Sequence, residues 1–297
     1  MNPIVQNYNI IRHFFMGLHY RDCLLVARMD LYNYPVYVIN LDRRPDRWAQ
    51  FQALEGVGAF KKLRRWSATD GRALDISANK DISLHTRYNI GRNLRRSHHE
   101  INTVGAIGAS YSHYRIWKDL VDSSEPGALV FEDDVYLDPV VLQRMRSAWA
   151  HAPACDMFLF GTHSWSHKEV PYQDRASYER VLEFNGAHAY YVSRSFAELL
   201  IKNFFPIEMH VEFYIYMTAA AHGCLLLRHK ELRVQYMSEV AKENDSDTFL
   251  SEDTCPLCDI PDRLNGVYIP YSRVREHVAT LGAAACVLAG YLMAKKG

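Results

Sequence analysis

The sequence has no excess of charge of either sign, because 34 Lys and Arg residues balance 34 Asp and Glu residues among its 297 residues. A balanced charge gives no overall attraction to nucleic acid or to an anionic membrane surface, so we expect no nucleic-acid partner and only local phosphate binding. Six cysteines without regular spacing do not make a disulfide scaffold. Internal repeats and low-complexity stretches are also missing, which excludes solenoid and disordered classes.

Long apolar runs are scarce and occur only near the C-terminal end. Charges interrupt residues 1–34, which we interpret as an N-terminal extension without a secretory signal. Residues 278–294 carry no charge, and their length is at the lower limit for a membrane-spanning helix. We therefore expect residues 276–297 to form a hydrophobic helix, either a membrane anchor or a helix packed against a soluble domain. The first case predicts a membrane-associated protein and the second a cytoplasmic one.

Between these ends, short apolar runs alternate with stretches of helical periodicity. Residues 36–41 (VYVINL) predict a strand, and apolar residues recur at helical spacing directly after it. A helix from Gly105 ends before Pro126 and Gly127, and a buried strand follows at 128–131. Further strands are expected at 156–160 and 187–192, and further helices at 195–203 and 211–222. This alternation predicts an α/β fold with a mostly parallel, twisted sheet flanked by helices.

Two clusters of charge follow two of the predicted strands. Glu132, Asp133 and Asp134 end the strand at 128–131, and Arg43, Arg44 and Arg47 follow the strand at 36–41. Ligands of open α/β sheets bind beyond the carboxyl ends of strands. Three adjacent carboxylates need a countercharge, and oxygen ligands suit Mg²⁺ or Mn²⁺.

The alternative to a binding site is that both clusters are solvated. The acids would then form a turn in which Asp134 or Asp138 caps the next helix, and the arginines would lie at an exposed helix start. Taken together, however, the two clusters favour a site for a nucleotide diphosphate, because guanidinium groups match phosphate oxygens.

The residues of the motifs and their order along the chain resemble those of glycosyltransferase family 25. The matching stretches are VYVINLDRRPDR, SATDGRAL, residues 105–138, GAHAYYVSRSFAELL, HVEFYIY, and VQY followed by SDT. The family includes bacterial lipooligosaccharide galactosyltransferases and procollagen galactosyltransferases, and residues 105–138 most resemble the collagen-modifying branch. The resemblance implies a GT-A-type fold and makes residues 35–275 a glycosyltransferase catalytic domain.

The resemblance also implies a UDP-sugar donor, UDP-galactose or UDP-glucose, and a divalent metal, usually Mn²⁺. By position in the family motifs, the residues on the donor side are Asn40, Arg43, Arg44, Arg47, Asp70, Gly71, Ser112, His113, Asp133, Gln235 and Ser246. The metal ligands, by the same correspondence, are Glu132, Asp133, Asp134 and Asp247. For His113 we expect structural support or positioning of the donor, with metal binding or acid–base work as the alternative.

Family members transfer sugar with inversion, which requires a general base opposite the leaving diphosphate. Glu212 occupies the place of a family Asp and is our candidate for this base, with Asp134 as the second catalytic carboxylate. The longer Glu side chain departs from the family pattern, and the alternative is a carboxylate that stabilises a helix N-terminus. The sequence thus predicts metal-dependent transfer of galactose or glucose to a hydroxyl group on a glycan or a hydroxylysine-type protein. The competing prediction is a catalytically silent member that serves as a binding or adhesion module.

Two further stretches are assigned more loosely. Residues 76–102, rich in Arg and His, and residues 165–180 are expected to be loops on the acceptor side, or else solvated loops. Cys255 and Cys258 form a single CxxC pair, which we interpret as free thiols or a local disulfide rather than a zinc site.

Overall fold

A computed structural model of the chain describes residues 29–95, 97–163, 168–173, 175–237 and 240. Its strands are β1 (Pro35–Asn40), β2 (Lys62–Ser67), β3 (Gly127–Glu132), β4 (Met157–Gly161), β5 (Lys168–Tyr172), β6 (Arg175–Glu183), β7 (Ala189–Ser193) and β8 (Leu226–His229). Its α-helices are α2 (Pro45–Gln52), α3 (Leu84–Arg92), α4 (Val104–Asp122), α5 (Pro139–His151), α6 (Arg194–Lys202) and α7 (Val211–His222). Short 3₁₀ helices are η2 (Leu31–Asn33), η3 (Val57–Ala59) and η4 (Gly71–Ala73).

The strands form one eight-stranded sheet in the order β2-β1-β3-β7-β4-β8-β6-β5. The α/β class and the GT-A-like architecture are confirmed, and the sheet is mixed rather than mostly parallel. Three neighbouring pairs are parallel, β1 with β2, β1 with β3, and β4 with β8. The other four pairs are antiparallel, because β7 inserts against the direction of β3 and β4 and a β5–β6 hairpin closes one edge. A buried apolar strand has the same pattern in either direction, so the sequence does not indicate how β7 runs.

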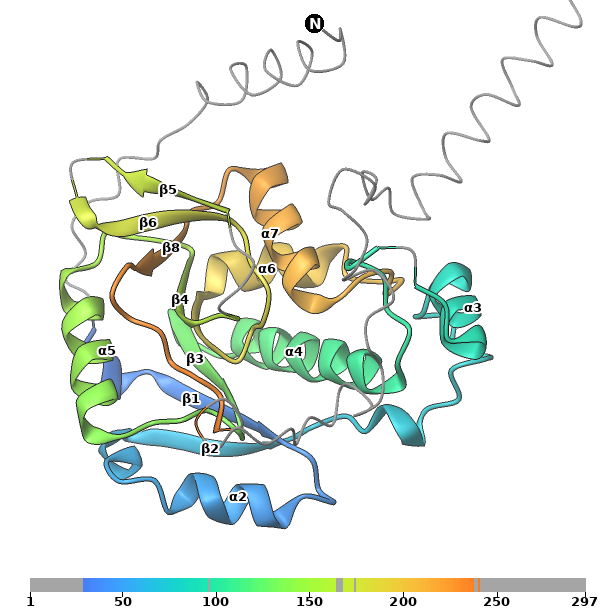
Figure 1. Cartoon of the computed structure of the whole chain (residues 1–297), viewed down its shortest axis with the longest axis horizontal. Helices are drawn as coiled ribbons and strands as arrows, with labels where there is room; N and C mark the ends of the chain where they lie inside the picture. The colour runs from blue at the N-terminus through green and yellow to red at the C-terminus, as the bar shows by residue number, and fades with distance from the viewer. Residues whose placement is uncertain (1–28, 96, 164–167, 174, 238–239, 241–297) are drawn as a thin grey trace, which may run out of the picture.

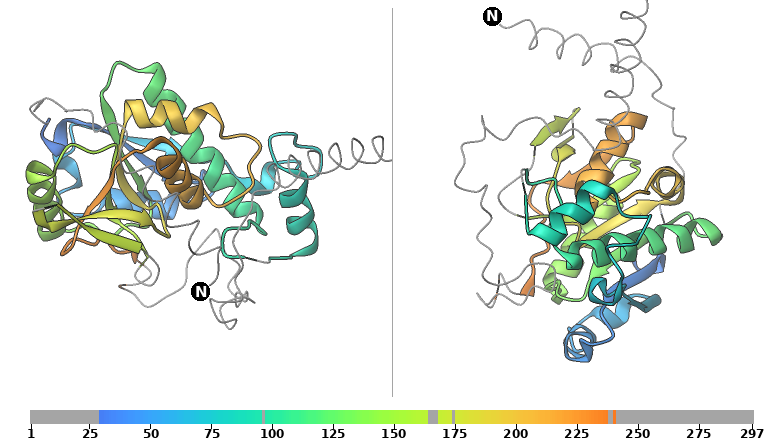
Figure 2. Two further views of the ribbon diagram at one scale, coloured as in Figure 1. Left: turned by 90° about the horizontal axis from the view of Figure 1, so that it is seen from above. Right: turned by 90° about the vertical axis from the view of Figure 1, so that its right-hand side faces the viewer.

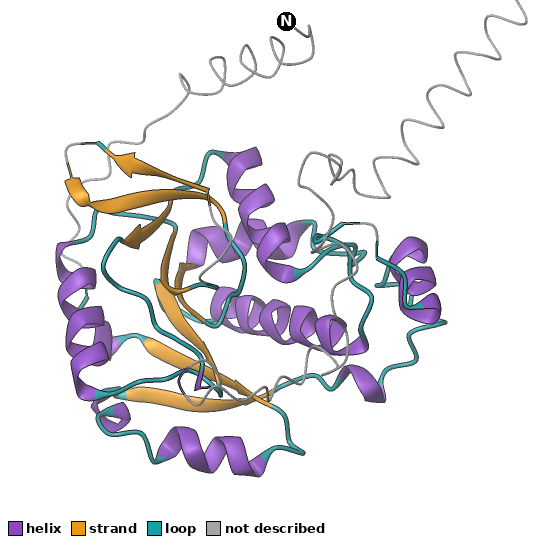
Figure 3. Ribbon diagram, viewed as in Figure 1, coloured by secondary structure: helices purple, strands orange, loops and turns teal. Residues whose placement is uncertain are grey.

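Helices cover both faces of the sheet, as Figures 2 and 3 show. Side chains from α4, α6 and α7 pack on one face and those from α2 and α5 on the other, giving two hydrophobic cores. Successive side chains of β1 point to opposite faces of the sheet and so contribute to both cores. Tyr37 points to the α4 side, while Val36 and Val38 point to the α5 side. The large buried aromatic anchors are Trp117 on α4 and Trp149 on α5.

Each predicted strand and helix between residues 36 and 222 has a counterpart in the structure within a few residues. The elements that were not predicted are β2, β5, β6, β8 and α3. The helix expected after Asp138 is α5, and Asp138 caps it by accepting from Val141 N at 2.7 Å. The stretch expected to be a loop at 165–180 instead contributes the β5–β6 hairpin, and residues 76–102 include α3, which lies at one end of the molecule (Figure 1).

The two chain ends are described only in part. Of the predicted N-terminal extension, residues 29–34 pack onto the domain: Leu31 is fully buried and the Trp149 Nε1–H donates to Met29 O at 3.0 Å. Cys255, Cys258 and the predicted helix at 276–297 lie outside the described residues.

The prediction of a membrane-associated protein is corrected. Within the described ranges, none of the helices combines the length and the apolar character needed to cross a bilayer. The prediction depended on residues 278–294, whose length is minimal and whose composition favours Ala and Gly over Leu, which makes it a weak membrane signal.

Candidate active site

The two charged clusters meet at one edge of the sheet. β1 and β3 are parallel neighbours, and Ile39 on β1 is in register with Glu132 on β3. The segments that follow both strands therefore leave the sheet side by side, as the sequence predicted. α2 begins at Pro45, a favoured first helical residue, and its first turn presents Arg47 to the acids that follow β3.

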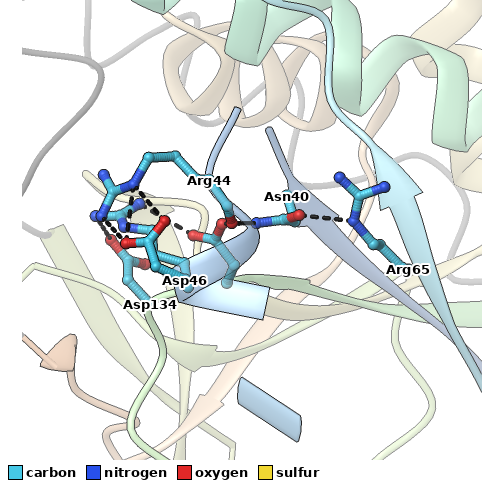
Figure 4. Close-up of polar contacts among 7 residues, drawn as sticks. Asn40, Arg44, Asp46, Arg65 and Asp134 are labelled. Carbon is cyan, nitrogen blue, oxygen red and sulfur yellow. Dashed lines mark hydrogen bonds and ion pairs between the residues drawn. The ribbon is translucent and has the colours of Figure 1, made fainter. Parts of the chain in front are cut away.

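Arg47 and Asn40 engage Asp133 from two sides. Arg47 Nη1 lies 3.0 Å from Asp133 Oδ1, and Asn40 Nδ2 donates to Asp133 Oδ2 at 2.6 Å. Figure 4 shows how Asn40 is oriented in turn, since its Oδ1 accepts from Arg65 Nε at 2.6 Å. Both oxygens of Asp133 are thus used within the protein. Burial raises the pKa of Asp133, and Arg47 and Asn40 oppose that shift.

Asp134 and Glu132 are less well compensated. Asp134 Oδ2 lies 3.3 Å from Arg47 Nη2, whereas its buried Oδ1 has no hydrogen-bond partner. Burial, followed by repulsion from Glu132, raises the pKa of Asp134 well above its usual range. Burial and the neighbouring Asp133 raise the pKa of Glu132 in the same way.

These two carboxylates could hold a divalent cation. A buried carboxylate oxygen without a donor and a pair of mutually repelling acids are what a bound Mg²⁺ or Mn²⁺ would neutralise. Asp133 is turned instead toward Arg47 and Asn40. Across the part of the chain that the structure describes, no three His, Cys, Asp or Glu side chains converge as a ready ligand set.

The acidic loop after β3 is held by the segment that follows β8. Met237 N donates to Asp134 O at 2.6 Å, Tyr136 N donates to Gln235 O at 2.8 Å, and Val135 forms a bridge with Tyr236. Gln235 therefore reaches the site through its main chain, while its side chain is exposed. Ser246 and Asp247 lie outside the described residues.

His188 is a site residue that the sequence analysis did not single out. Its carbonyl oxygen accepts from Glu132 N at 2.9 Å, and its Nε2 lies 2.8 Å from Val234 O. It thereby joins β7 to both the acidic residues and the segment that holds them. Its signal was available, because a His in the apolar run of the GAHAYY motif is a buried polar group that needs a partner.

Asp70 and Gly71 belong to a turn that docks on α4, where Ser112 holds it. Ser112 Oγ accepts from Thr69 N at 2.9 Å and donates to Gly108 O at 2.7 Å. A Cβ on Gly71 would overlap the carbonyl of Val104, so only glycine allows this approach. Ser112 is fully buried and therefore anchors the turn rather than lining the site.

The two remaining arginines of the cluster lie at the edge of the site in exposed ion pairs. Arg43 Nε donates to Asp70 Oδ2 at 2.9 Å, and Arg44 Nη2 lies 2.8 Å from Asp46 Oδ2. Partial burial alone would raise the pKa of Asp70. The hydrogen bonds from Arg72 N and Arg43 outweigh this effect, so the pKa of Asp70 is lowered. The predicted donor-side residues Arg43 and Asp70 are thus brought together.

His113 and Glu212 lie on the α4 and α7 side of the acidic loop. His113 Nε2 is 3.8 Å from Glu132 Oε1, and burial lowers the His113 pKa to about 4, so the imidazole is neutral. Glu212 is in the first turn of α7, and burial, with repulsion from Glu132, raises its pKa to about 7. A carboxylate with a pKa near neutrality suits a general base.

Comparison with known proteins agrees with this geometry. A family model described as glycosyltransferase family 25 (LPS biosynthesis protein) matches residues 33–215, which is more than half of the chain. The match includes both charged clusters and extends to Glu212.

Similar proteins carry related names. A "Glycosyltransferase 25 family member" of Drosophila pseudoobscura pseudoobscura is 30% identical over 145 residues, covering 46% of this chain and 22% of the relative. A "Procollagen lysyl hydroxylase and glycosyltransferase" of Acanthamoeba polyphaga mimivirus is 35% identical over 116 residues, covering 34% and 12%. A human protein named "Inactive glycosyltransferase 25 family member 3" is 38% identical over 109 residues, covering 34% and 16%. The matched part of this chain thus spans at most 22% of the length of these relatives.

Proposed function

Because the chain belongs to glycosyltransferase family 25, we propose that it moves galactose or glucose from a UDP-sugar to a hydroxyl group of a glycan or of a hydroxylysine-type protein. The observation that carries the proposal is the meeting of Arg47 with the acids that follow β3, where Glu132 and Asp134 remain short of positive charge. A nucleotide diphosphate with its cation is the ligand that such a mixed site would bind.

We assign the cation to Glu132 and Asp134, with Mn²⁺ or Mg²⁺ as the ion. When bound, it supplies positive charge that stabilises a leaving diphosphate. Asp133 contributes indirectly, since it fixes Arg47 and Asn40 beside the site. Asp247 is a further candidate ligand outside the described residues.

Side chains of the protein bind the donor and deprotonate the acceptor. Arg43 and Arg44 lie at the rim, where guanidinium groups can bind phosphate oxygens, and Asp70 can accept hydrogen bonds from the ribose or uracil. Glu212 removes the proton from the acceptor hydroxyl. The acceptor oxygen then bonds to the anomeric carbon while the bond to UDP breaks and its electron pair leaves with UDP, which inverts the anomeric centre.

The choice of acceptor is supported by the relatives and by the surroundings of Glu212. The mimivirus relative carries a name that includes procollagen lysyl hydroxylase, which favours hydroxylysine among protein hydroxyls. Arg95 is close enough to Glu212 to lower its pKa, so the segment that follows α3 lies near the proposed base. Residues 95–102 are therefore our candidates for acceptor contacts.

The test is mass spectrometry of acceptor mixtures incubated with UDP-galactose or UDP-glucose and Mn²⁺. The panel contains hydroxylysine peptides, lipooligosaccharide fragments and free sugars. We expect one acceptor class to gain a hexose, and Glu212→Gln to lower the rate of this gain by about 10²–10⁴-fold while UDP still binds. No hexose transfer and no UDP release with any acceptor would refute the proposal.

Two observations favour a second candidate, a binding module without turnover. The human relative carries the word inactive in its name, and Glu212 replaces the Asp expected in the family motif. A silent member would bind a glycan or UDP without releasing UDP from a UDP-sugar. Binding without turnover in the same assay would therefore identify this alternative.

A further inference from the structure

Two hydrogen bonds link Trp117, Tyr190 and His113 in the core directly behind the proposed cation site. Trp117 Nε1 on α4 lies 3.1 Å from Tyr190 Oη on β7, and Tyr190 Oη lies 2.8 Å from His113 Nδ1. The other ring nitrogen of His113, Nε2, faces Glu132 Oε1 at 3.8 Å. All three ring side chains are at most 1% exposed, so water does not compete for the two hydrogen bonds among them, whereas the Glu132 side chain is 30% exposed.

The direction of the chain follows from counting protons. An indole nitrogen can only donate, so Tyr190 Oη accepts from Trp117. The Tyr190 phenol has one proton of its own, and His113 Nδ1 is the other hydrogen-bond partner of Oη within the described residues. If Nδ1 carried a proton, both neighbours would donate to Oη and the buried phenol proton would have no acceptor. Tyr190 therefore donates and His113 Nδ1 accepts.

The tautomer of His113 follows directly. A neutral imidazole has a single N–H, and with Nδ1 accepting, that proton is on Nε2. The same count excludes the doubly protonated ring. The stacking of the His113 and Tyr190 rings, 5.7 Å between centroids at 25°, keeps both groups in this relation.

We propose that Trp117, Tyr190 and His113 form a directional hydrogen-bond chain that fixes His113 as the Nε2–H tautomer and points this N–H at the Glu132 carboxylate. His113 is thus a positioning residue: its Nε2–H faces one oxygen of Glu132 at 3.8 Å, an electrostatic contact rather than a hydrogen bond, and leaves the other oxygen for a ligand. Partners of this kind behind ligating side chains typically affect affinity or activity by about 10–100-fold. The tautomer assignment stands on the contacts alone, and its catalytic consequence rests on the proposed function.

The first experiment reads the tautomer without activity. In a spectrum that correlates ¹⁵N with ring protons of histidine-labelled protein, His113 is identified by the signals that vanish in His113→Gln. We expect the Nε2–H pattern in the wild-type protein. In Tyr190→Phe the pattern should shift toward the other tautomer or a mixture. An Nδ1–H or doubly protonated His113 in the wild-type protein would overturn the proposal.

The second experiment uses a pair of amide substitutions. A Gln amide reaches the position of Nε2, whereas an Asn amide reaches that of Nδ1, so His113→Gln keeps a donor toward Glu132 and His113→Asn does not. We expect kcat/KM to fall about 10–100-fold in His113→Asn and clearly less in His113→Gln. Equal losses in both would overturn the positioning role.

Tyr191→Phe is the matched control for removing a buried phenol, because Tyr191 packs in the opposite core. It should leave the His113 spectrum unchanged. If Tyr190→Phe does not fold, the wild-type spectrum and the amide pair still decide the matter. A wild-type protein with the Nε2–H pattern but no transfer activity would refute the proposed function while upholding the hydrogen-bond chain.

Discussion

Arg47 and Asp133 form an ion pair that is almost completely buried, with Nη1 3.0 Å from Oδ1 and side chains 9% and 7% exposed. Removing the guanidinium in Arg47→Ala leaves Asp133 buried without its cation and weakens the only cationic contact of Asp134 among those described. Breaking a buried pair in this way typically destabilises a protein by about 3–5 kcal/mol. We expect a loss of that size in the free energy of unfolding, measured with urea.

The matched control for this substitution is Lys62→Ala. Lys62 pairs with Glu125 at the surface, where its side chain is 49% exposed, and such pairs contribute about 0–1 kcal/mol. If Arg47→Ala is as mild as Lys62→Ala, the Arg47 pair does not organise the acidic loop.

The acids after β3 should make the metal-free protein sensitive to pH. Folding raises the pKa of Glu132 and Asp134, so their protonated forms favour the folded state, and this contribution is lost as the pH rises through the raised values. The free energy of unfolding of the metal-free protein should therefore be larger near about pH 6 than near about pH 8. Asp134→Asn should remove part of this dependence and stabilise the metal-free protein by about 1 kcal/mol near about pH 8, or about 2–4 °C in Tm.

Mn²⁺ should reverse the order of the two proteins. At about 100 times its Kd, a bound ion stabilises the folded state by about 2.7 kcal/mol, and EDTA removes this gain. The wild-type protein should show the gain and Asp134→Asn should lose most of it. An equal thermal shift in both would place the ion elsewhere.

Glu212 should control the pH dependence of turnover. A general base acts in its deprotonated form, and with a pKa raised to about 7 the base becomes competent as the pH increases through about 7. We expect kcat to rise between about pH 6 and about pH 8. Glu212→Gln should lower kcat by about 10²–10⁴-fold with the affinity for UDP unchanged.

Glu212→Asp restores the residue type of the family motif with a shorter side chain. If position 212 holds the base, this variant should retain more activity than Glu212→Gln. Glu212→Gln with wild-type kcat would show that the carboxylate only stabilises the N-terminus of α7.

Gly71 should tolerate no side chain. A Cβ there would overlap the main-chain carbonyl of Val104, which belongs to α4 and cannot rotate away, so we expect Gly71→Ala to destabilise the protein by about 3 kcal/mol. In Gly91→Ala on α3 the new Cβ meets open space, and the better helix propensity should stabilise by about 0.5–1 kcal/mol. Thermal unfolding measures both, and an unchanged Tm in Gly71→Ala would contradict the docking of the Asp70 turn on α4.

The parts of the fold that could be predicted are those with strong local patterns. The strand at 36–41 is a short apolar run, the helix after it has apolar residues at helical spacing, and the helix at 211–222 is a longer, mostly apolar run. The two charged clusters meet because their strands are parallel neighbours. β2 was not predicted because half of the residues in KLRRWS are charged and the strand lies at the edge of the sheet. The antiparallel direction of β7 depends on its pairing with β3 and β4, and the local sequence of β7 does not indicate these partners.

The candidate site divides in the same way. The acids and arginines were found because clustered charge at a strand end needs an explanation. Their individual roles were not predictable: Asp133 is occupied by Arg47 and Asn40, and Ser112 is an anchor for a turn 43 residues away in sequence. The roles of His188 and Tyr190 depend on hydrogen bonds to residues of other elements, Val234 and His113, which the local sequence does not indicate.

Calorimetric titration of UDP, with and without Mn²⁺, shows whether the acidic loop binds a nucleotide together with a cation, because it separates binding at this loop from the choice of sugar and acceptor. We predict binding heat for the wild-type protein only when Mn²⁺ is present. Asp134→Asn should lose this heat, and Asp122→Asn, which alters an exposed ion pair on α4, should keep it. UDP binding that is independent of Mn²⁺, binding that Asp134→Asn leaves unchanged, or no binding at all would contradict a cation-dependent nucleotide site at Asp134.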